Sequence, residues 1–277
     1  MADFSAADVK RLRELTAAGM MDCKKALQEA DGDFDQAVEV LRLKGAKDVH
    51  KRSERTTSNG LVAAHMAGDN LGVLLELNCE TDFVAKNERF GELATQLTEH
   101  IATARPADVA ALFDSTLAGK TVQDLVEETS AALGEKILVN RFVLFDAGHV
   151  VTYLHKSSPD LPPQIGTLVE LDGEDAEMGR NIAQHIAATQ PKYLTRDEVP
   201  EEAVDSERRL AEQMARDEGK PEQAVPKIIE GRVSAFYKEV VLLEQPWIRD
   251  QKQSIRKVLE DAGTNVRRFA RFQVGQS

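Results

Sequence analysis

The sequence predicts an α+β protein that begins with a small helical bundle and continues as a core of two related units, each an antiparallel sheet with a helix. Three observations indicate this architecture. Apolar residues recur with the helical period up to residue 45, and from residue 60 they follow the period of strands. The core then repeats part of itself, because residues 165–172 echo residues 71–78. A charged helical hairpin is expected to interrupt the second unit.

Length and composition indicate ordinary hydrophobic cores. The chain has 277 residues, of which 42% are hydrophobic and 30% charged, enough for two or more modules. The net charge of −12 argues against direct nucleic-acid binding, because phosphate contacts need a surplus of lysine and arginine on one face. No apolar run approaches the roughly 20 residues that span a bilayer, and no signal sequence is evident. A cytoplasmic protein without membrane contacts is therefore expected.

Residues that carry metal or redox chemistry are sparse. Cys23 and Cys79 have no Cys or His neighbours at ligand spacing, so neither a disulfide nor a zinc site is expected. We interpret both as buried apolar side chains. The six histidines also lack the spacing of metal-binding or protease motifs. Two of them, His100 and His185, occupy equivalent places in the repeat, which favours a packing role.

The closest approach to a nucleotide-binding loop is the stretch 118–121, AGKT. A phosphate loop requires glycine five positions before its second glycine, and Asp114 stands there instead. The stretch is therefore interpreted as a helix cap. With no activated nucleophile and no buried acid pair in the pattern, the sequence predicts no active site, no cofactor and no enzymatic activity.

Residues 1–46 are predicted to form a domain of three short helices. Ser5 caps the first, which presents Val9, Leu12 and Leu15 on one face and ends near Gly19. The second spans about 22–30, and the third follows the 31–33 turn and closes at Gly45.

Met20 and Met21 fall in the first loop of this domain. Two adjacent apolar side chains in a tight loop cannot both point inward. They either close the bundle together or face a partner, a role that suits methionine. Residues 47–59, basic and poor in apolar side chains, are interpreted as a linker or a loosely packed helix.

Residues 60–147 are predicted to form the first core subdomain. Strands at 61–66 and 71–77 read as a hairpin. One helix face then carries apolar residues up to Pro106, and a further helix begins at Thr121 and stops at Gly134. A strand at 137–145 completes the unit.

The internal repeat singles out Asp82 and Phe83. From Asn78 to His100 there are 22 positions, whereas the equivalent interval from Asp172 to His185 has 13, so the first copy holds nine extra residues. These extra residues include Asp82 and Phe83. An element that one copy contains and the other lacks is not required by the shared fold, which favours a functional role.

The second core subdomain is predicted in two parts, residues 148–192 and 238–277. Its first part has a strand at 149–154 with His155 at an exposed tip, and its second part has strands at 240–243 and 266–274 around a helix near 255–259. Residues 193–237 form the inserted helical hairpin. Because its arms carry many charges and few core positions, it projects either for self-association or as a solvated spur.

Several motifs closely resemble those of the bacterial elongation factor Ts family. They are VKRLRELT at 9–16, GMMDCKKAL at 19–27, NCETDFVAK at 78–86, GKP at 219–221 and EGR at 230–232. The resemblance implies a ubiquitin-associated-like (UBA-like) three-helix domain at the start, two related core subdomains, and a helical-hairpin insertion in the second.

The resemblance also implies guanine-nucleotide exchange on elongation factor Tu, with no covalent chemistry. The residues that match the family's wedge are Thr81, Asp82, Phe83 and Val84, which enter between helices of the GTPase and disturb its Mg²⁺ and phosphates. The residues that match further partner contacts are Arg13, Met20, Met21 and His155. The implied assembly is a heterodimer or a dimer of heterodimers.

Two other classes of function are kept as alternatives. The first domain is able, on its sequence, to serve as a peptide-binding adaptor without the core. The remaining alternative is an unrecognised hydrolase, which turnover of a nucleotide by the isolated protein would reveal.

Overall fold

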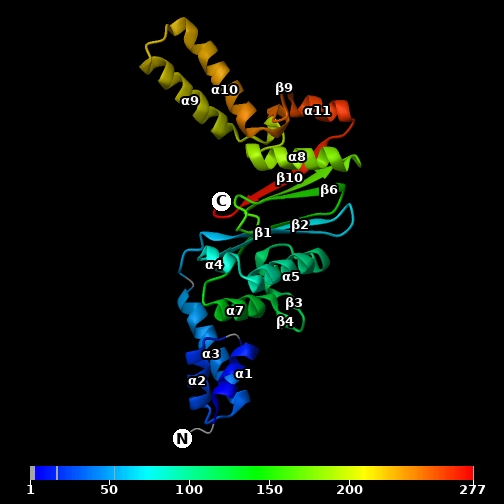
Figure 1. Ribbon diagram of the computed structural model, residues 1–277. Helices are drawn as coiled ribbons and strands as arrows, with labels where there is room; N and C mark the ends of the chain where they lie inside the picture. The colour runs from blue at the N-terminus through cyan, green and yellow to red at the C-terminus, as the bar shows by residue number, and fades with distance from the viewer. Residues whose placement is uncertain (1–3, 17, 53, 277) are drawn as a thin grey trace.

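The computed structural model describes residues 4–16, 18–52 and 54–276. The molecule is elongated, with the N-terminal helices at one end, two sheets in the middle and a helical hairpin projecting at the other end (Figure 1). Helices and antiparallel sheets together confirm the α+β class. Among the described residues, no helix is long and apolar enough to cross a membrane.

The N-terminal domain consists of α1 (Ala6–Thr16), α2 (Met20–Glu29) and α3 (Phe34–Arg52). Its core is made of small and branched apolar side chains that recur at helical spacing. The buried residues are Val9, Leu12, Cys23, Ala26, Leu27, Ala30, Ala37 and Leu41.

Three local predictions for this domain are wrong. Helix α3 does not close at Gly45 but runs to Arg52, so the start of the predicted linker 47–59 is helical. An interior glycine costs only about 1 kcal/mol relative to alanine, and no proline follows to end the helix. Met20 and Met21 begin α2, with Gly19 at its N-cap, rather than lying in a loop. Leu15 points away from the bundle and is 66% exposed.

The first core sheet has the order β1-β2-β5, formed by β1 (Asn59–Met66), β2 (Gly72–Cys79) and β5 (Leu138–Phe145). Every residue of β2 is buried, as expected for a central strand. Helix α5 (Glu88–Ala104) covers the sheet, and α7 (Val122–Leu133) packs against α5. Between these helices lie α6 (Val109–Asp114), β3 (Thr116–Leu117) and β4 (Lys120–Thr121).

The second core sheet has the order β10-β7-β6, formed by β6 (His149–His155), β7 (Ile165–Leu171) and β10 (Val266–Gln273). Helix α8 (Ala176–Thr189) packs on this sheet. The apolar face of α11 (Ile255–Ala262) joins the same core through Ile255 and Leu259.

The predicted repeat is present in three dimensions. The echoed strands β2 and β7 are the central strands of the two sheets, and each is followed by the helix that covers its sheet. The sheets meet through glycines at equivalent positions. A Cβ atom on Gly72 would lie 2.8 Å from Leu168, and one on Gly166 would lie 2.8 Å from Leu74. A larger residue at either position would have to displace these side chains, so glycine allows the close approach of the two halves.

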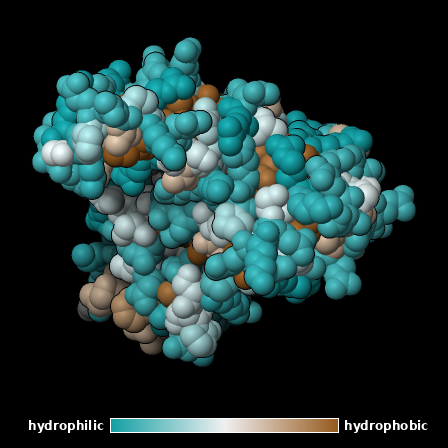
Figure 2. All heavy atoms as spheres, turned by 90° about the horizontal axis from the view of Figure 1, so that it is seen from above, coloured by the Kyte–Doolittle hydropathy of each residue, from teal (hydrophilic) through white to brown (hydrophobic). Residues whose placement is uncertain are grey.

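The projecting hairpin consists of α9 (Glu201–Asp217) and α10 (Val225–Val240). Short 3₁₀ turns flank its helices at Arg196–Glu198, Glu222–Ala224 and Leu242–Glu244. Viewed from above, the surface is largely hydrophilic with small scattered apolar patches (Figure 2).

The strand predicted at 240–243 is absent. Val240 ends α10, Leu242 begins a 3₁₀ turn, and Val241 makes an isolated bridge to Tyr193. Val240, Val241 and Leu242 are buried in succession, and so short an apolar run carries no periodicity that distinguishes strand from helix. The small pair β8 (Pro246–Trp247) and β9 (Asp250–Ser254) follows.

Candidate functional site

The extra residues of the first repeat form a four-residue helix, α4 (Asp82–Ala85), between β2 and α5. Thr81 is its N-cap, with an extended backbone and a side-chain oxygen that accepts a hydrogen bond from Val84 N at 3.4 Å. Val84 and Ala85 are buried against the first core. The turn is therefore anchored on one side only.

Phe83 lies on the opposite side of this turn and is 80% exposed. No other large apolar side chain in the described part of the chain is exposed to this extent. A solvated phenylalanine beside two buried neighbours contributes little to its own fold. Its apolar surface is available to a partner, as the unmatched insertion predicts.

Asp82 is partly exposed beside Phe83 and pairs with the side chain of Lys86 at the end of the helix. The Lys86 Nζ lies 2.8 Å from Asp82 Oδ2. This hydrogen bond is the main reason that the pKa of Asp82 is lowered. The carboxylate therefore remains ionised at neutral pH and offers a negative charge next to the exposed ring.

A carboxylate that the sequence analysis missed holds the start of α4. Glu135 Oε2 accepts hydrogen bonds from Glu80 N and Thr81 N, each at 3.0 Å, and Oε1 accepts one from Thr81 Oγ1 at 2.5 Å. The only sequence signal was an acidic residue directly after the helix stop at Gly134, which does not reveal its partner. Glu80 in turn accepts from Lys136 N at 2.7 Å.

The residues predicted as contacts in the first domain are exposed. Arg13 lies on α1, and Met20 and Met21 are 59% and 64% exposed at the start of α2. The alternative that both methionines close the bundle is therefore excluded. Leu15 adds a further exposed apolar side chain on α1 that was wrongly assigned to the core.

His155 is exposed at the last position of β6, with Nδ1 3.1 Å from the hydroxyl of Tyr153. The loop that follows it is tied to the first sheet, because Val62 N donates to Pro163 O at 2.8 Å. Val62 lies three residues from Asn59, which pairs with Cys79, the last residue of β2, three positions before α4 begins. The fold thus brings His155 and α4 to the same end of the stacked sheets.

Comparison with known proteins identifies the family. A sequence model described as Elongation factor TS matches residues 80–276. The chain is 63% identical to an elongation factor Ts of Acidothermus cellulolyticus, with all of both chains covered. It is 57% identical to that of Thermobifida fusca, again with full coverage of both, and 57% identical to that of Streptomyces coelicolor, with 99% and 100% covered. The chain belongs to the elongation factor Ts family. It is thus a translation elongation factor.

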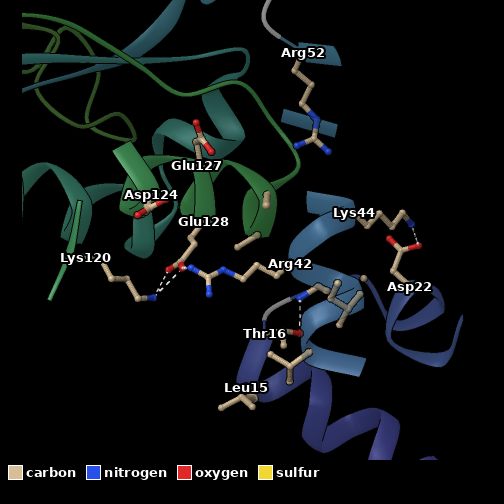
Figure 3. Close-up of a pocket in the computed structure, with 16 residues that line it drawn as sticks. Leu15, Thr16, Asp22, Arg42, Lys44, Arg52, Lys120, Asp124, Glu127 and Glu128 are labelled. Atoms are coloured by element: carbon tan, nitrogen blue, oxygen red, sulfur yellow. Dashed lines mark hydrogen bonds and ion pairs between the residues drawn. The ribbon is translucent and has the colours of Figure 1, made fainter. Parts of the chain in front are cut away.

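In this member of the elongation factor Ts family, a cleft of about 390 Å³ lies between the N-terminal helices and α7. Figure 3 shows Arg42 of α3 directed toward Glu128 of α7, which also binds Lys120. The cleft contains none of the predicted contact residues. The ion pair between Arg42 and Glu128 joins the first domain to the core, whereas Lys120 pairs with Glu128 within the core and Lys44 pairs with Asp22 within the first domain.

In this elongation factor Ts chain, His185 and both cysteines are buried inside the fold. His185 is fully buried, with Nε2 2.9 Å from Gln245 Oε1, and burial lowers its pKa. Cys23 and Cys79 are free and buried, as predicted, and burial raises the pKa of Cys79 to about 12. The described residues contain no group of three or more potential metal ligands.

Proposed function

We propose that this protein is the guanine-nucleotide exchange factor of elongation factor Tu and acts by binding, without covalent chemistry or a cofactor. The observation that carries the proposal is the exposed side chain of Phe83 on an anchored turn, in a chain of the elongation factor Ts family. We place its action in the cytoplasm, where elongation takes place.

The proposed mechanism rests on differential affinity for the nucleotide-free GTPase. The turn of Thr81, Asp82, Phe83 and Val84 enters between helices of the GTPase on the Mg²⁺ and phosphate side of its site, with Phe83 exposed to the partner and Val84 buried beneath it. A protein that binds the empty state more tightly weakens GDP binding, and GDP weakens its binding by the same factor. The wedge therefore stabilises the empty state until GTP binds.

The two central residues have different roles in this proposal. Burial of Phe83 in the partner contributes about 1.5–3 kcal/mol of binding free energy. Asp82 brings negative charge close to phosphates and to a Mg²⁺ ion that demands near-ideal octahedral geometry, so a small displacement weakens the ion's hold. In this proposal, Phe83 contributes affinity for the nucleotide-free GTPase, and Asp82 accelerates the release of GDP.

The other predicted contacts extend the interface along the molecule. Arg13, Met20 and Met21 present one surface from the domain at 1–46, and His155 presents another from the subdomain that begins at 148. The hairpin at 193–237 is proposed for self-association, giving a dimer of heterodimers rather than a single heterodimer. Leu210 and Met214, 50% and 40% exposed one turn apart on α9, support this use.

The test is release of a fluorescent GDP analogue from elongation factor Tu, followed by stopped flow. The intact protein is expected to accelerate release, and the double variant Asp82→Ala, Phe83→Ala is not. Equal acceleration by both proteins would leave exchange intact but contradict the wedge. No acceleration by the intact protein would contradict the proposed function.

A peptide-binding adaptor is the second candidate. The exposed Leu15, Met20 and Met21 of the first domain favour it, because they offer an apolar surface that does not depend on α4. This alternative requires partner binding that the double variant of Asp82 and Phe83 retains in full.

A further inference from the structure

We propose that Glu135 is the positioning residue of the wedge: through Thr81 it holds α4 in the orientation that presents Phe83 to the partner. The inference rests on the proposed exchange function and adds to it a residue outside the motif. Glu135 lies 54 positions from Thr81 in the sequence, and its carboxylate binds Glu80 and Thr81.

The helix α4 cannot hold its own orientation. A helix of four residues is far below the length at which isolated helices form in water. Phe83 adds no packing, since its ring is solvated. The order of the turn therefore depends on the buried side chains of Val84 and Ala85 and on the polar contacts at its N-cap, Thr81.

The Glu135 carboxylate provides these polar contacts. It accepts hydrogen bonds from the backbone N–H of Glu80 and from the backbone N–H and hydroxyl of Thr81, and charge-assisted bonds of this kind are about twice as strong as neutral ones. Because Thr81 Oγ1 donates its proton to Glu135, the oxygen lone pairs face α4 and accept from Val84 N. Glu135 thus determines which hydrogen bonds the Thr81 hydroxyl makes as well as the position of Thr81.

Glu135 is itself fixed by a rigid element. It follows α7 through Gly134, whose φ of +77° is a left-handed conformation that favours glycine. Ser130 Oγ, on the last turn of α7, donates to the carbonyl of Glu135 at 2.5 Å. The carboxylate therefore transmits the position of α7 to the base of the wedge.

A second carboxylate makes the contact reciprocal. Glu80 accepts from Lys136 N, so the two loops exchange a hydrogen bond in each direction. Arg55, on the segment that connects α3 to β1, donates to both Glu80 oxygens at 3.2 and 3.3 Å. The connection from the first domain thus ends at the residue before the N-cap.

The test compares Glu135→Gln with Glu92→Gln, the same chemical change at an exposed position on α5. Glutamine replaces one acceptor oxygen by an NH₂ donor that faces other donors. The amides of Val84, Ala85 and Lys86 are expected to exchange hydrogen faster in Glu135→Gln, by about 2- to 30-fold, the range for loss of a helix cap. Those of β2 and α5, and all amides of Glu92→Gln, are expected to keep their protection.

The second readout is nucleotide-exchange activity, measured as the release of GDP from elongation factor Tu. The concentration of Glu135→Gln that gives half-maximal GDP release is expected to rise by about 2- to 30-fold, because the partner must then order α4. Thr81→Val, which removes the hydroxyl, is expected to behave similarly, whereas Thr81→Ser restores near-normal values. In the double variant Glu135→Gln, Thr81→Val, the rise in the half-maximal concentration should be far less than the two single effects combined. The reason is that both changes remove the same hydrogen bond.

The outcomes separate the inference from the proposed function. Unchanged protection of α4 in Glu135→Gln overturns the inference, whatever the partner does. If the α4 amides of Glu135→Gln exchange hydrogen faster but GDP release is unchanged, the positioning role is overturned. In that case, impaired GDP release with Phe83→Ala would still support the wedge. Loss of protection throughout the core would mean a general structural role and also overturns it. A wild-type protein that fails to accelerate release overturns the proposed function itself.

Discussion

Arg141 of β5 lies over the ring of Phe272 in β10, with its guanidinium carbon 4.6 Å from the ring centroid. Arg268 of β10 makes the reciprocal contact with Phe145 of β5 at 4.3 Å. The third strand of each repeat thus reaches across to the third strand of the other. These paired cation–π contacts join the two halves of the core on which the wedge is mounted.

Arg141 also neutralises Glu76, a fully buried carboxylate in the centre of β2, at 2.8 Å. Arg141→Met is therefore expected to lower the free energy of unfolding by about 3–5 kcal/mol, because it leaves a buried charge without its partner. Urea denaturation measures this. The further change Glu76→Gln should recover part of the loss, and a loss below about 1 kcal/mol for Arg141→Met alone would contradict the interpretation.

Phe83→Ala and Asp82→Ala should separate affinity from release. Because Phe83 is solvated in the free protein, its replacement is expected to change the free energy of unfolding by less than about 0.5 kcal/mol. Affinity for nucleotide-free elongation factor Tu should fall roughly 10- to 150-fold, the equivalent of about 1.5–3 kcal/mol. Asp82→Ala should mainly slow GDP release at saturation. Calorimetry and stopped flow measure the two effects, and equal effects of both changes on both quantities would refute this division.

The double variant Met20→Ala, Met21→Ala tests the contact surface of the first domain. Both side chains are exposed, so thermal stability should hold while affinity for elongation factor Tu falls by about tenfold or more. The maximal rate of GDP release should remain, because the wedge is untouched. Lys24→Ala, an exposed position on the same helix, serves as the control. An unchanged affinity would remove this surface from the proposed interface.

The buried His185 predicts a pH dependence of stability. Burial lowers its pKa, so the folded state binds this proton less readily than the unfolded chain, in which the ordinary value is near 6.5. Its contribution is present above pH 6.5 and is lost as the pH falls from there toward the folded pKa. The free energy of unfolding should decline in that window with a slope of up to about 1.4 kcal/mol per pH unit.

The variant His185→Gln isolates this contribution, because glutamine does not titrate and retains a donor for Gln245. Urea denaturation from pH 7.5 to pH 5 is expected to show a smaller slope for the variant than for the wild type. Parallel curves for the two proteins would assign the acid sensitivity to other groups.

Local pattern predicted most elements because it records which faces are buried. The caps at Thr121 and Gly134 bound α7 as expected, and the strand at 266–274 corresponds to β10. The errors fall where the local signal is weak. A glycine at 45 did not stop α3, and the short apolar run at 240–243 carried no period.

The sequence by itself determined most of the longer elements, the repeat, and the exposure of Phe83 on the nine residues that one repeat adds. These follow from spacing along the chain. Only the tertiary structure decided what holds that segment in place: Glu135 on Thr81 and Arg55 on Glu80 join residues 54 and 25 positions apart. Such polar contacts produce no periodic pattern in the sequence. They depend on where α7 and the end of β2 meet in space, whereas periodicity records only which face of an element is apolar.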